Sequence, residues 1–512
     1  MHIAKREKPM NSSLDTPRHA VARQPLMPAI GRDDSPFAGD AGSEGTIAII
    51  GGGFSGAATA WNLARSGRDL RIMVFEPRSR LGAGLAYDTV DPVHRINVPS
   101  SRMSIDIDRP DDFADWLAAG RYVESDPEAS SRDGNLFPRR KAFGDYVADR
   151  IAPFIKSGRV AHVRARVTEL SRGEAGWLVV TEDGVARQAD RVIIATSHPA
   201  PAAPRLLSSM LEGHPRFVPD ATAPGALDRI RTSDAVLVVG NGLTSADVIA
   251  SLLRKGHGGP ITSISRRGLR SRGHAPAPQA PHGDFTSRPI TSARLLTRRI
   301  REAIRQAGIF GVGWHAVLDA VRAQGGEIWN NLPTAERLRL VRHLRPFWDV
   351  HRFRIAPQVE SALAAATARG QLETLAASVA AVSYHAGRIR TALRRAHAGG
   401  TTIRDFDAVV VTTGPAHGAV IEGQAYLQKL AGEGLAAPDP ARLGLWCDRH
   451  SRLLDCEGWP VEGVYVAGPL ARGTFGELMG LPQVSEHAAA VASEVLASTG
   501  TAARERRTAI RP

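Results

Sequence analysis

One stretch near the start of the chain constrains the fold more than any other. Residues 46–50 form an apolar run that breaks into glycines and continues as an Ala- and Leu-rich helical pattern. This order predicts a strand, a tight turn and a helix, with Gly51, Gly53 and Gly56 in the spacing of a dinucleotide-binding fingerprint. Gly51 allows the turn, Gly53 lets the backbone approach a pyrophosphate, and Gly56 lets the helix pack closely on the strand. The pyrophosphate is then expected at the helix N-terminus, where free N–H groups and the dipole favour negative charge.

The residues that follow this helix support the same interpretation. A second apolar run at 70–75 ends in Glu76, which lies 20 residues after Gly56. An acid at that position binds the ribose hydroxyls of the adenosine half of a dinucleotide. The alternative is a purely structural turn, because Ala- and Gly-rich chains produce glycine patterns by chance. The register of both strands, the helix, the glycines and the acid favours cofactor binding.

The same pattern recurs in the middle of the chain. Residues 235–246 again predict a strand, a glycine turn and a helix. Their turn contains Gly240, Gly242 and Thr244, and Ser245 stands where the third glycine would be. The repeat predicts a second dinucleotide site.

The two copies differ at the end of their second strand. Glu76 lies 25 positions after Gly51, whereas 25 positions after Gly240 the chain has Ser265, followed by Arg266 and Arg267. A serine followed by two arginines suits a 2′-phosphate through charge-assisted contacts, which favours NADPH over NADH. The alternative is that both arginines are solvated surface charges.

Composition limits the remaining possibilities. A chain of 512 residues with 43% hydrophobic content can bury large cores and is expected to form two or three domains. The net charge of +13 comes almost wholly from scattered arginines, without a compact basic block interleaved with aromatics. This pattern argues against a nucleic-acid partner and favours anionic small molecules such as nucleotides.

Several further classes of protein are excluded by simple counts. Cys447 and Cys456 form no C-x-x-C pair, which argues against a disulfide scaffold and a thioredoxin-reductase-like dithiol. The histidines show no spacing typical of metal ligands, so no metal site is predicted. No apolar run is long enough for a membrane helix, and the expected location is cytoplasmic. Residues 1–44 and 498–512 are expected to be a disordered leader and tail.

Other segments fit the surroundings of a cofactor or have a simpler explanation. The glycine-rich loop 81–87 suits close approach to a planar ligand, and the polar loop 94–104 either caps local structure or lines a site. Residues 190–199 predict a buried strand that ends in small residues, and 407–415 repeat this pattern. His351, Arg352 and Arg354 can bind an anion or simply decorate a helix end.

The order of these parts carries a family resemblance that spans about residues 46–495. The chain resembles flavoproteins with two dinucleotide-binding domains, in particular the bacterial FAD/NAD(P)-binding proteins, which are similar to flavin-containing and N-hydroxylating monooxygenases. The matching segments are 51–56 with Glu76, 82–87, 94–104, 137–146, 239–247, 265–268, 351–357, 412–414, and Gly468 with 481–483. Residues 190–201 and 407–417 look like divergent versions of a strand found in N-hydroxylases.

The resemblance implies an α/β fold with two Rossmann-like, doubly wound, three-layer domains, in which the NADPH domain is inserted into the FAD domain. The FAD domain is expected at 45–200 and 405–497, and the NAD(P)H domain at 201–404 with a helical insertion at about 269–360. The expected FAD contacts are Gly51, Gly53, Phe54, Ser55, Gly56, Glu76, Leu85, Asn97, Ala195, Thr196, Gly468 and Gln483. The expected NADPH contacts are Gly240, Gly242, Thr244, Ser245, Ser265, Arg266 and Arg267. The resemblance also implies that Asn97 lies near the flavin ring.

These expectations lead to a functional hypothesis. The chain is predicted to be an FAD-dependent oxidoreductase that NADPH reduces and that hydroxylates a small amine-type substrate with O₂ through a flavin hydroperoxide. The protein then orients the cofactors and excludes water, so no side-chain base is required. The alternatives are an NADPH-dependent flavin reductase or dehydrogenase without oxygen transfer, and a flavin-binding regulatory protein without turnover. The sequence assigns no oligomeric state.

Overall fold

The computed structural model describes residues 44–509 except 198, 200, 386, 397, 398 and 415–418, with side chains up to Thr499. The leader expected at 1–44 lies outside the described residues apart from Glu44. So do parts of the two strand ends that resemble an N-hydroxylase element, namely His198, Ala200 and residues 415–417.

The first sheet is assembled from both ends of the chain. Its strand order is β15-β16-β7-β1-β2-β3, and all neighbours are parallel except β15 and β16. The strands are β1 (Gly45–Ile50), β2 (Leu70–Phe75), β3 (Val160–Val163), β7 (Arg191–Ile194), β15 (Arg452–Leu454) and β16 (Pro460–Val466). Because β16 pairs directly with β7, this sheet joins segments that are far apart in the sequence.

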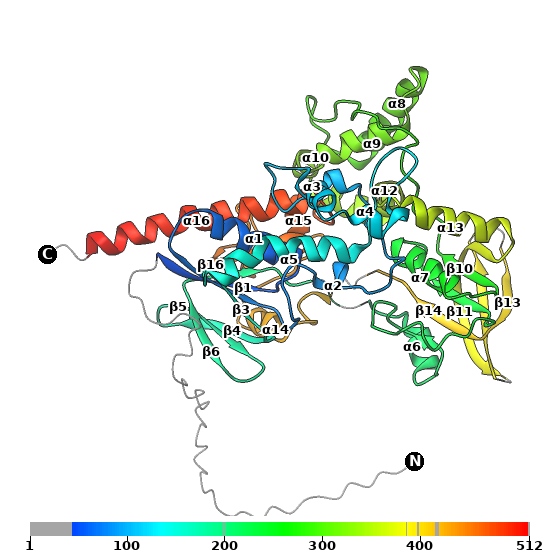
Figure 1. Ribbon diagram of the computed structural model, residues 1–512, viewed down its shortest axis with the longest axis horizontal. Coiled ribbons are helices and arrows are strands. Elements are labelled where there is room, and N and C mark those ends of the chain that lie inside the picture. Colours follow the sequence, from blue (N-terminus) through cyan, green and yellow to red (C-terminus); the bar gives the residue numbers. More distant parts are fainter. Residues whose placement is uncertain are drawn as a thin grey trace, which may run out of the picture. The chain divides into compact units, whose positions relative to one another are not determined.

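Both faces of this sheet are buried. Along β1, Ile47 and Ile49 join the core formed with α1 (Phe54–Arg65), α5 (Arg140–Lys156) and α16 (Gln483–Ala509). The alternate residues Ala48 and Ile50 join a second core. That core is formed with α14 (Ala425–Gly432) and the antiparallel sheet of β4 (Val167–Gly173), β5 (Gly176–Thr181) and β6 (Ala186–Ala189). The continuous apolar run is therefore typical of a covered parallel strand, and the three layers are visible in Figure 1.

The second sheet lies entirely within the intervening chain. Its order is β13-β12-β11-β10-β9-β14-β8, parallel from β8 to β11 and antiparallel from β11 to β13. The strands are β8 (Phe217–Val218), β9 (Val236–Val239), β10 (Ile261–Ser265), β11 (Leu372–His385), β12 (Arg388–Arg395), β13 (Thr401–Phe406) and β14 (Ala408–Val411). Its helices are α6 (Arg205–Leu211), α7 (Leu243–Arg254) and α13 (Pro357–Ala368).

One predicted domain boundary requires correction. We expect residues 405–411 in the FAD domain, but β14 pairs with β9 and β8 and so belongs to the second sheet. The Asp407 carboxylate also accepts a hydrogen bond at 2.8 Å from the Ala235 amide at the start of the glycine-turn strand. Backbone pairing therefore extends the second domain to at least Val411.

A helical segment is inserted between β10 and β11. It contains α8 (Ala293–Ile309), α9 (Trp314–Ala323), α10 (Gly325–Asn331), α11 (Thr334–Arg339), the π-helix η3 (Leu340–Leu344) and α12 (Arg345–Arg352). The Ser292 hydroxyl caps α8 by accepting from the Leu295 amide at 3.2 Å. These helices share an apolar core of their own, which includes Phe285, Val317 and Ile328.

The remaining described helices are short and connect the larger elements. They are α2 (Gly84–Tyr87), α3 (Asp112–Ala119), α4 (Tyr122–Ser125) and α15 (Arg472–Phe475), with 3₁₀ turns at Ser100–Arg102, Pro127–Ala129 and Gly468–Ala471. Helix α16 continues to Ala509, so the predicted tail boundary at 498 does not coincide with the end of the helix. Among the described helices, none is both long and apolar enough to span a membrane.

Candidate functional site

Glycine is sterically required at two of the three signature positions of the first turn. Gly51 has φ of 102°, and a Cβ there would lie 2.7 Å from the carbonyl oxygen of Ala195. A Cβ on Gly56 would lie 1.9 Å from the carbonyl oxygen of Gly51, so only glycine lets α1 pack this closely on β1. The structure therefore gives Gly51 and Gly56 the roles predicted for them.

The N-terminus of α1 is open to a ligand. Gly53 is its N-cap, and no side chain caps the helix. A Cβ on Gly53 would meet only the Cα of Gly84, at 3.5 Å. Phe54 and Ser55 begin the helix, and their first-turn N–H groups form a site that suits a pyrophosphate. The geometry of the residues present thus fits the dinucleotide expected here.

Gly468 closes one side of this turn. It has φ of 75°, and a Cβ there would lie 2.1 Å from the Ser55 hydroxyl oxygen. The chain that leads from β16 to α16 consequently passes directly over the start of α1. Two segments far apart in sequence therefore meet beside the first glycine turn.

Glu76 lies at the carboxyl end of β2, beside the same turn. Its side chain is buried, and one carboxylate oxygen accepts from the Gly52 amide at 3.1 Å. The other oxygen accepts from the amide and the guanidinium of Arg78, both at 3.1 Å. A carboxylate has about four lone-pair positions, so Glu76 retains capacity for ribose hydroxyls.

The loop that carries Leu85 passes the open end of α1. A Cβ on Gly84 would lie 3.0 Å from the Cα of Gly53, and Leu85 is 49% exposed. On another side of the turn, the hydroxyls of Thr196 and Tyr426 lie 2.9 Å apart and share a hydrogen bond. Leu85 and Thr196 therefore flank the same glycine turn from different segments.

Gln483 starts α16, where its side chain is held by a residue that the sequence analysis does not identify. Arg322 of α9 donates to the Gln483 side-chain oxygen at 2.6 Å and to the Leu481 carbonyl at 2.7 Å. Burial, and then the nearby Arg352, lower the pKa of Arg322 to about 10. The inserted helices therefore fix the start of α16, which is expected to face the flavin.

His487, one helical turn further along α16, is a second residue that sequence reasoning does not identify. Its Nδ1 accepts from the Gly468 amide at 3.0 Å, so the proton resides on Nε2, which donates to the Ser451 hydroxyl at 3.1 Å. Burial lowers the pKa of His487 to about 4, which keeps the ring neutral. A histidine one turn after Gln483 in an Ala-rich helix is the only sequence signal for this role.

Asn97 connects the first domain to the inserted segment. Its side-chain oxygen accepts from the Ala356 amide at 3.2 Å, and its carbonyl accepts from Nε2 of His274 at 3.1 Å. Burial, reinforced by Arg354, lowers the pKa of His274 to about 4, so this ring is a neutral donor. The polar loop at 94–104 is therefore held by long-range contacts.

The second glycine turn keeps two of the three signature glycines of the first. Gly240 has φ of 127°, and a Cβ there would lie 2.7 Å from the carbonyl oxygen of Thr412. Gly242 is the uncapped N-cap of α7, a Cβ on it would meet nothing within 4 Å, and Thr244 follows in the first turn. Ser245 replaces the third glycine, and its hydroxyl lies 3.3 Å from that of Ser263.

The predicted 2′-phosphate residues lie at the carboxyl end of β10. The Ser265 hydroxyl accepts from the Asn241 side chain at 3.2 Å, so it lies next to the glycine turn. Arg266 is exposed, whereas the guanidinium of Arg267 lies 5.3 Å from the centre of the Phe347 ring. Arg266 is thus the more accessible of the two cations.

Polar contacts join the two glycine-turn regions. The Ser251 hydroxyl on α7 donates to Asp91 at 2.7 Å and lies 3.2 Å from Nε2 of His94. Arg140 at the start of α5 forms an ion pair of 2.8 Å with Asp247 of α7. The helix that opens at the second turn is therefore held against the first domain.

Three basic residues considered as anion ligands have structural partners instead. Arg354 pairs with Asp319 at 2.8 Å, and Arg352 pairs with Glu477. His351 donates from Nδ1 to the Phe347 carbonyl at 2.7 Å. These contacts favour the simpler explanation, in which the three residues stabilise the end of α12.

The comparisons with known proteins agree with this geometry. Residues 48–199 match the model of a family described as FAD-NAD(P)-binding. No curated protein matches the chain. Three solved structures align over nearly their whole length.

The first is the reduced form of ornithine hydroxylase from Pseudomonas aeruginosa, at 15% identity and TM-score 0.59, covering 88% of this chain and 98% of that one. The cadaverine monooxygenase of Erwinia amylovora, bound to FAD, gives 14% identity and TM-score 0.58, covering 88% and 94%. The ornithine N-hydroxylase of Kutzneria sp. 744 gives 17% identity and a TM-score of 0.56, and the alignment covers 91% of this chain and 100% of that one. The chain has the fold of these enzymes. The predicted α/β fold with two dinucleotide-binding domains is confirmed.

Proposed function

We propose that this protein is an FAD-dependent monooxygenase that is reduced by NADPH and hydroxylates the nitrogen of a small amine. The observation that carries the proposal is the pair of glycine turns with different strand ends, Glu76 in one and Ser265 with Arg266 in the other. This pair lies within a fold shared with ornithine hydroxylase and cadaverine monooxygenase.

The first turn is proposed to hold FAD. The amides at the start of α1 bind the pyrophosphate, Glu76 accepts from the ribose, and the α16 start fixed by Arg322 faces the flavin ring. Bound FAD would supply hydride acceptance and reaction with O₂. The protein residues bind and orient it, while the buried loop around Gly468 excludes water.

The second turn is proposed to hold NADPH. The amides at the start of α7 bind its pyrophosphate, and Arg266 binds the 2′-phosphate. Asp91, His94 and Ser251 hold α7 against the first domain, and these contacts would help to orient a dinucleotide bound at the second turn.

The cysteines do not suit a mechanism in which a disulfide accepts the electrons. Burial raises the pKa of Cys447 to about 12, which keeps it a thiol, and its hydroxyl neighbour is Thr474 at 3.5 Å. Cys456 is exposed, and both are free thiols. Neither belongs to a redox pair in the described chain.

The amine is proposed to lie beside Asn97. Both oxygens of this residue are occupied by Ala356 and His274, and its amide N–H groups remain available to orient a ligand. The neutral state of His274 avoids a positive charge that would repel an ammonium group.

The test is an anaerobic titration of the flavin-loaded protein with NADPH, followed by O₂ and a panel that includes ornithine, lysine and cadaverine. We expect the flavin absorption to bleach with NADPH, and the product mass to increase by one oxygen atom. Bleaching followed only by hydrogen peroxide with every amine would remove the monooxygenase assignment. A yellow protein that NADPH fails to bleach would remove the enzyme assignment.

A further inference from the structure

The inserted helices enclose a cavity that is separate from the residues expected to bind either cofactor. Its volume is about 420 Å³, within the range of small-molecule sites. Its walls come from α8, α9, α10, η3, α12 and the segment around Arg472, Gly476 and Glu477. None of the residues expected to bind FAD or NADPH lines it.

The walls of this cavity are largely apolar. Helix α8 contributes Leu296, Ile300 and Ile304, which are four residues apart and therefore lie on one face of the helix. The opposite walls include the indoles of Trp314, Trp329 and Trp348. A cavity of this kind favours an aliphatic or aromatic body, because burial removes apolar surface from water.

A single buried cation lies in the wall of the cavity. Arg472 is 5% exposed, and its Nη1 has no hydrogen-bond partner among the described atoms. Its Nε reaches only the Gly476 carbonyl, at 3.4 Å. Burial lowers the pKa of Arg472 to about 10, so the group stays charged at neutral pH. A buried charged donor without an acceptor is costly, which points to a missing anion.

Asp349 and Glu477 interact electrostatically with Arg472, but no carboxylate hydrogen-bonds to its Nη1 among the described residues. Glu477 accepts from the Trp348 indole at 2.8 Å and from Arg352 through its other oxygen. Asp349 pairs with Arg345 at 3.2 Å, and burial raises the pKa of Asp349, which weakens it as a counter-ion. With Asp439, which also interacts electrostatically with Arg472, three carboxylates face the three arginines, and what is missing is a hydrogen-bond acceptor at Nη1 of Arg472.

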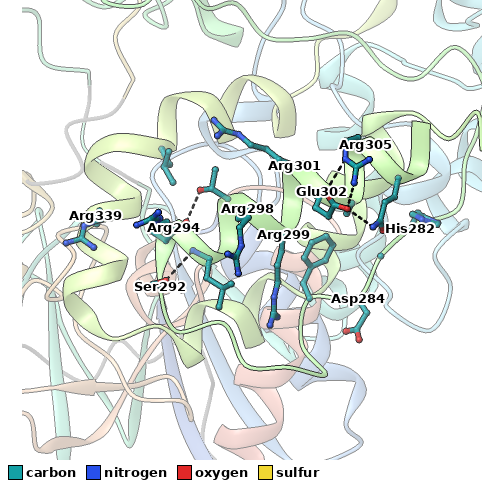
Figure 2. A pocket seen from close by; sticks show the side chains of 18 of the residues that line it. His282, Asp284, Ser292, Arg294, Arg298, Arg299, Arg301, Glu302, Arg305 and Arg339 are labelled. Atoms are coloured by element: carbon teal, nitrogen blue, oxygen red, sulfur yellow. Dashed lines mark hydrogen bonds and ion pairs between the residues drawn. The ribbon is translucent and has the colours of Figure 1, made fainter. Parts of the chain in front are cut away.

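A basic groove adjoins the cavity. Thr297, Arg301 and Leu344 line both. Figure 2 shows the arginine side chains of α8 along this groove, with Glu302 occupied by Arg305. The exposed members without an ion pair in the described chain are Arg294, Arg298 and Arg301. Such a field raises the local concentration of anions and speeds their association.

We propose that the cavity binds an amphipathic carboxylate, with its apolar body among the tryptophans and its carboxylate on Nη1 of Arg472. The groove on α8 attracts the anion, and the cavity selects it by its apolar part. The proposal does not depend on the proposed oxidation, since it rests on a separate set of residues.

The test is calorimetric titration of the full-length protein, without NADPH, using decanoate, decanol and decylamine as probes of equal chain length. We expect decanoate to bind at least about tenfold more tightly than decanol, and decylamine to bind less tightly than either. Equal affinity for decanoate and decanol, or no binding of decanoate, would overturn the proposal.

Three variants at two positions locate the site. Arg472→Met is expected to abolish the preference for decanoate over decanol, whereas Arg472→Lys retains it. Because Arg472 is buried and its replacement can impair folding, Ile300→Trp provides an independent test. Ile300 is only partly buried, and an indole there fills the cavity and should block all three probes. Unchanged decanoate affinity in folded Ile300→Trp would place the ligand elsewhere.

The role of the basic groove is tested by the rate at which decanoate associates. Arg298→Gln combined with Arg301→Gln should slow decanoate association severalfold at low salt, with little change at high salt. An association rate that is insensitive to both the variants and salt would remove the groove from the proposal. None of these measurements uses turnover, so their failure is distinguishable from failure of the proposed reaction.

Discussion

The two glycine turns share their backbone geometry. They differ in side chains that would distinguish one dinucleotide from another. In each, a carboxylate on the neighbouring strand accepts from the amide at the start of the glycine strand, at 2.8 Å. Asp190 binds the Thr46 amide, and Asp407 binds the Ala235 amide. Each first glycine packs against the end of that neighbouring strand. Repeated backbone geometry therefore requires the same residue types at matching positions.

Two of the differences lie at the third signature glycine and at the end of the second strand. Gly56 has no room for a Cβ, whereas its counterpart Ser245 places a hydroxyl beside Ser263. The buried Glu76 corresponds to Ser265, which is followed by the exposed Arg266. A common fold can thus carry different ligand preferences through a few side chains, while the shared positions preserve the turn.

The largest expected effect comes from adding a side chain to the first turn. Gly56→Val places atoms against the Gly51 carbonyl, and we expect a loss of about 3 kcal/mol or more in stability together with loss of bound flavin. Urea unfolding and the absorbance of purified protein measure both. The matched change Ser245→Ala should be mild. An equal loss of stability in Gly56→Val and Ser245→Ala would show that the two turns are packed equally tightly.

The second prediction concerns His487, which supports the first turn and has a folded-state pKa of about 4. The unfolded ring has a pKa of about 6.5 and takes up a proton first as pH falls. The stability that the neutral His487 ring contributes is therefore fully present above about pH 6.5, and it is lost as the pH falls from 6.5 to about 4. His487→Gln should reduce the loss between pH 7 and 5 by about 2 kcal/mol.

Urea unfolding at several pH values measures this difference. A pH dependence in His487→Gln identical to that of the unmodified protein would contradict the assigned role.

The third prediction compares the two strand carboxylates. Asp190→Ala and Asp407→Ala should each cost about 1.5 kcal/mol, because each leaves a strand amide without its charged acceptor. We expect the first to weaken flavin retention and the second to weaken NADPH binding. Cofactor titrations of both variants test this separation, and identical defects would indicate that the domains do not respond separately.

The smallest expected effect concerns cofactor preference. Arg266→Gln should raise the KM for NADPH about tenfold, equivalent to about 1.4 kcal/mol, with little change for NADH. Arg254→Gln, which changes an exposed arginine at the end of α7, is the control. A similar loss for NADPH and NADH would argue against a 2′-phosphate contact.

Part of the site was accessible from the sequence because it is local. The turn at 51–56, the acid at the end of the next strand and the second copy at 240–245 lie within short segments. The apolar runs around them predict parallel strands covered on both faces, and the cores on either side of β1 confirm this. The boundary at 405 failed because two strands with similar sequences pair in different sheets.

The sequence by itself determined the two strand–turn–helix units and the contrast between Glu76 and Ser265, since the backbone geometry of a turn restricts its own residues. Only the tertiary structure decided which distant side chains complete them. Arg322 binds Gln483 across 161 positions, and Asn97 meets Ala356 across 259. Hydrogen bonds over such separations depend on how whole elements dock, and no local pattern of residues records that docking.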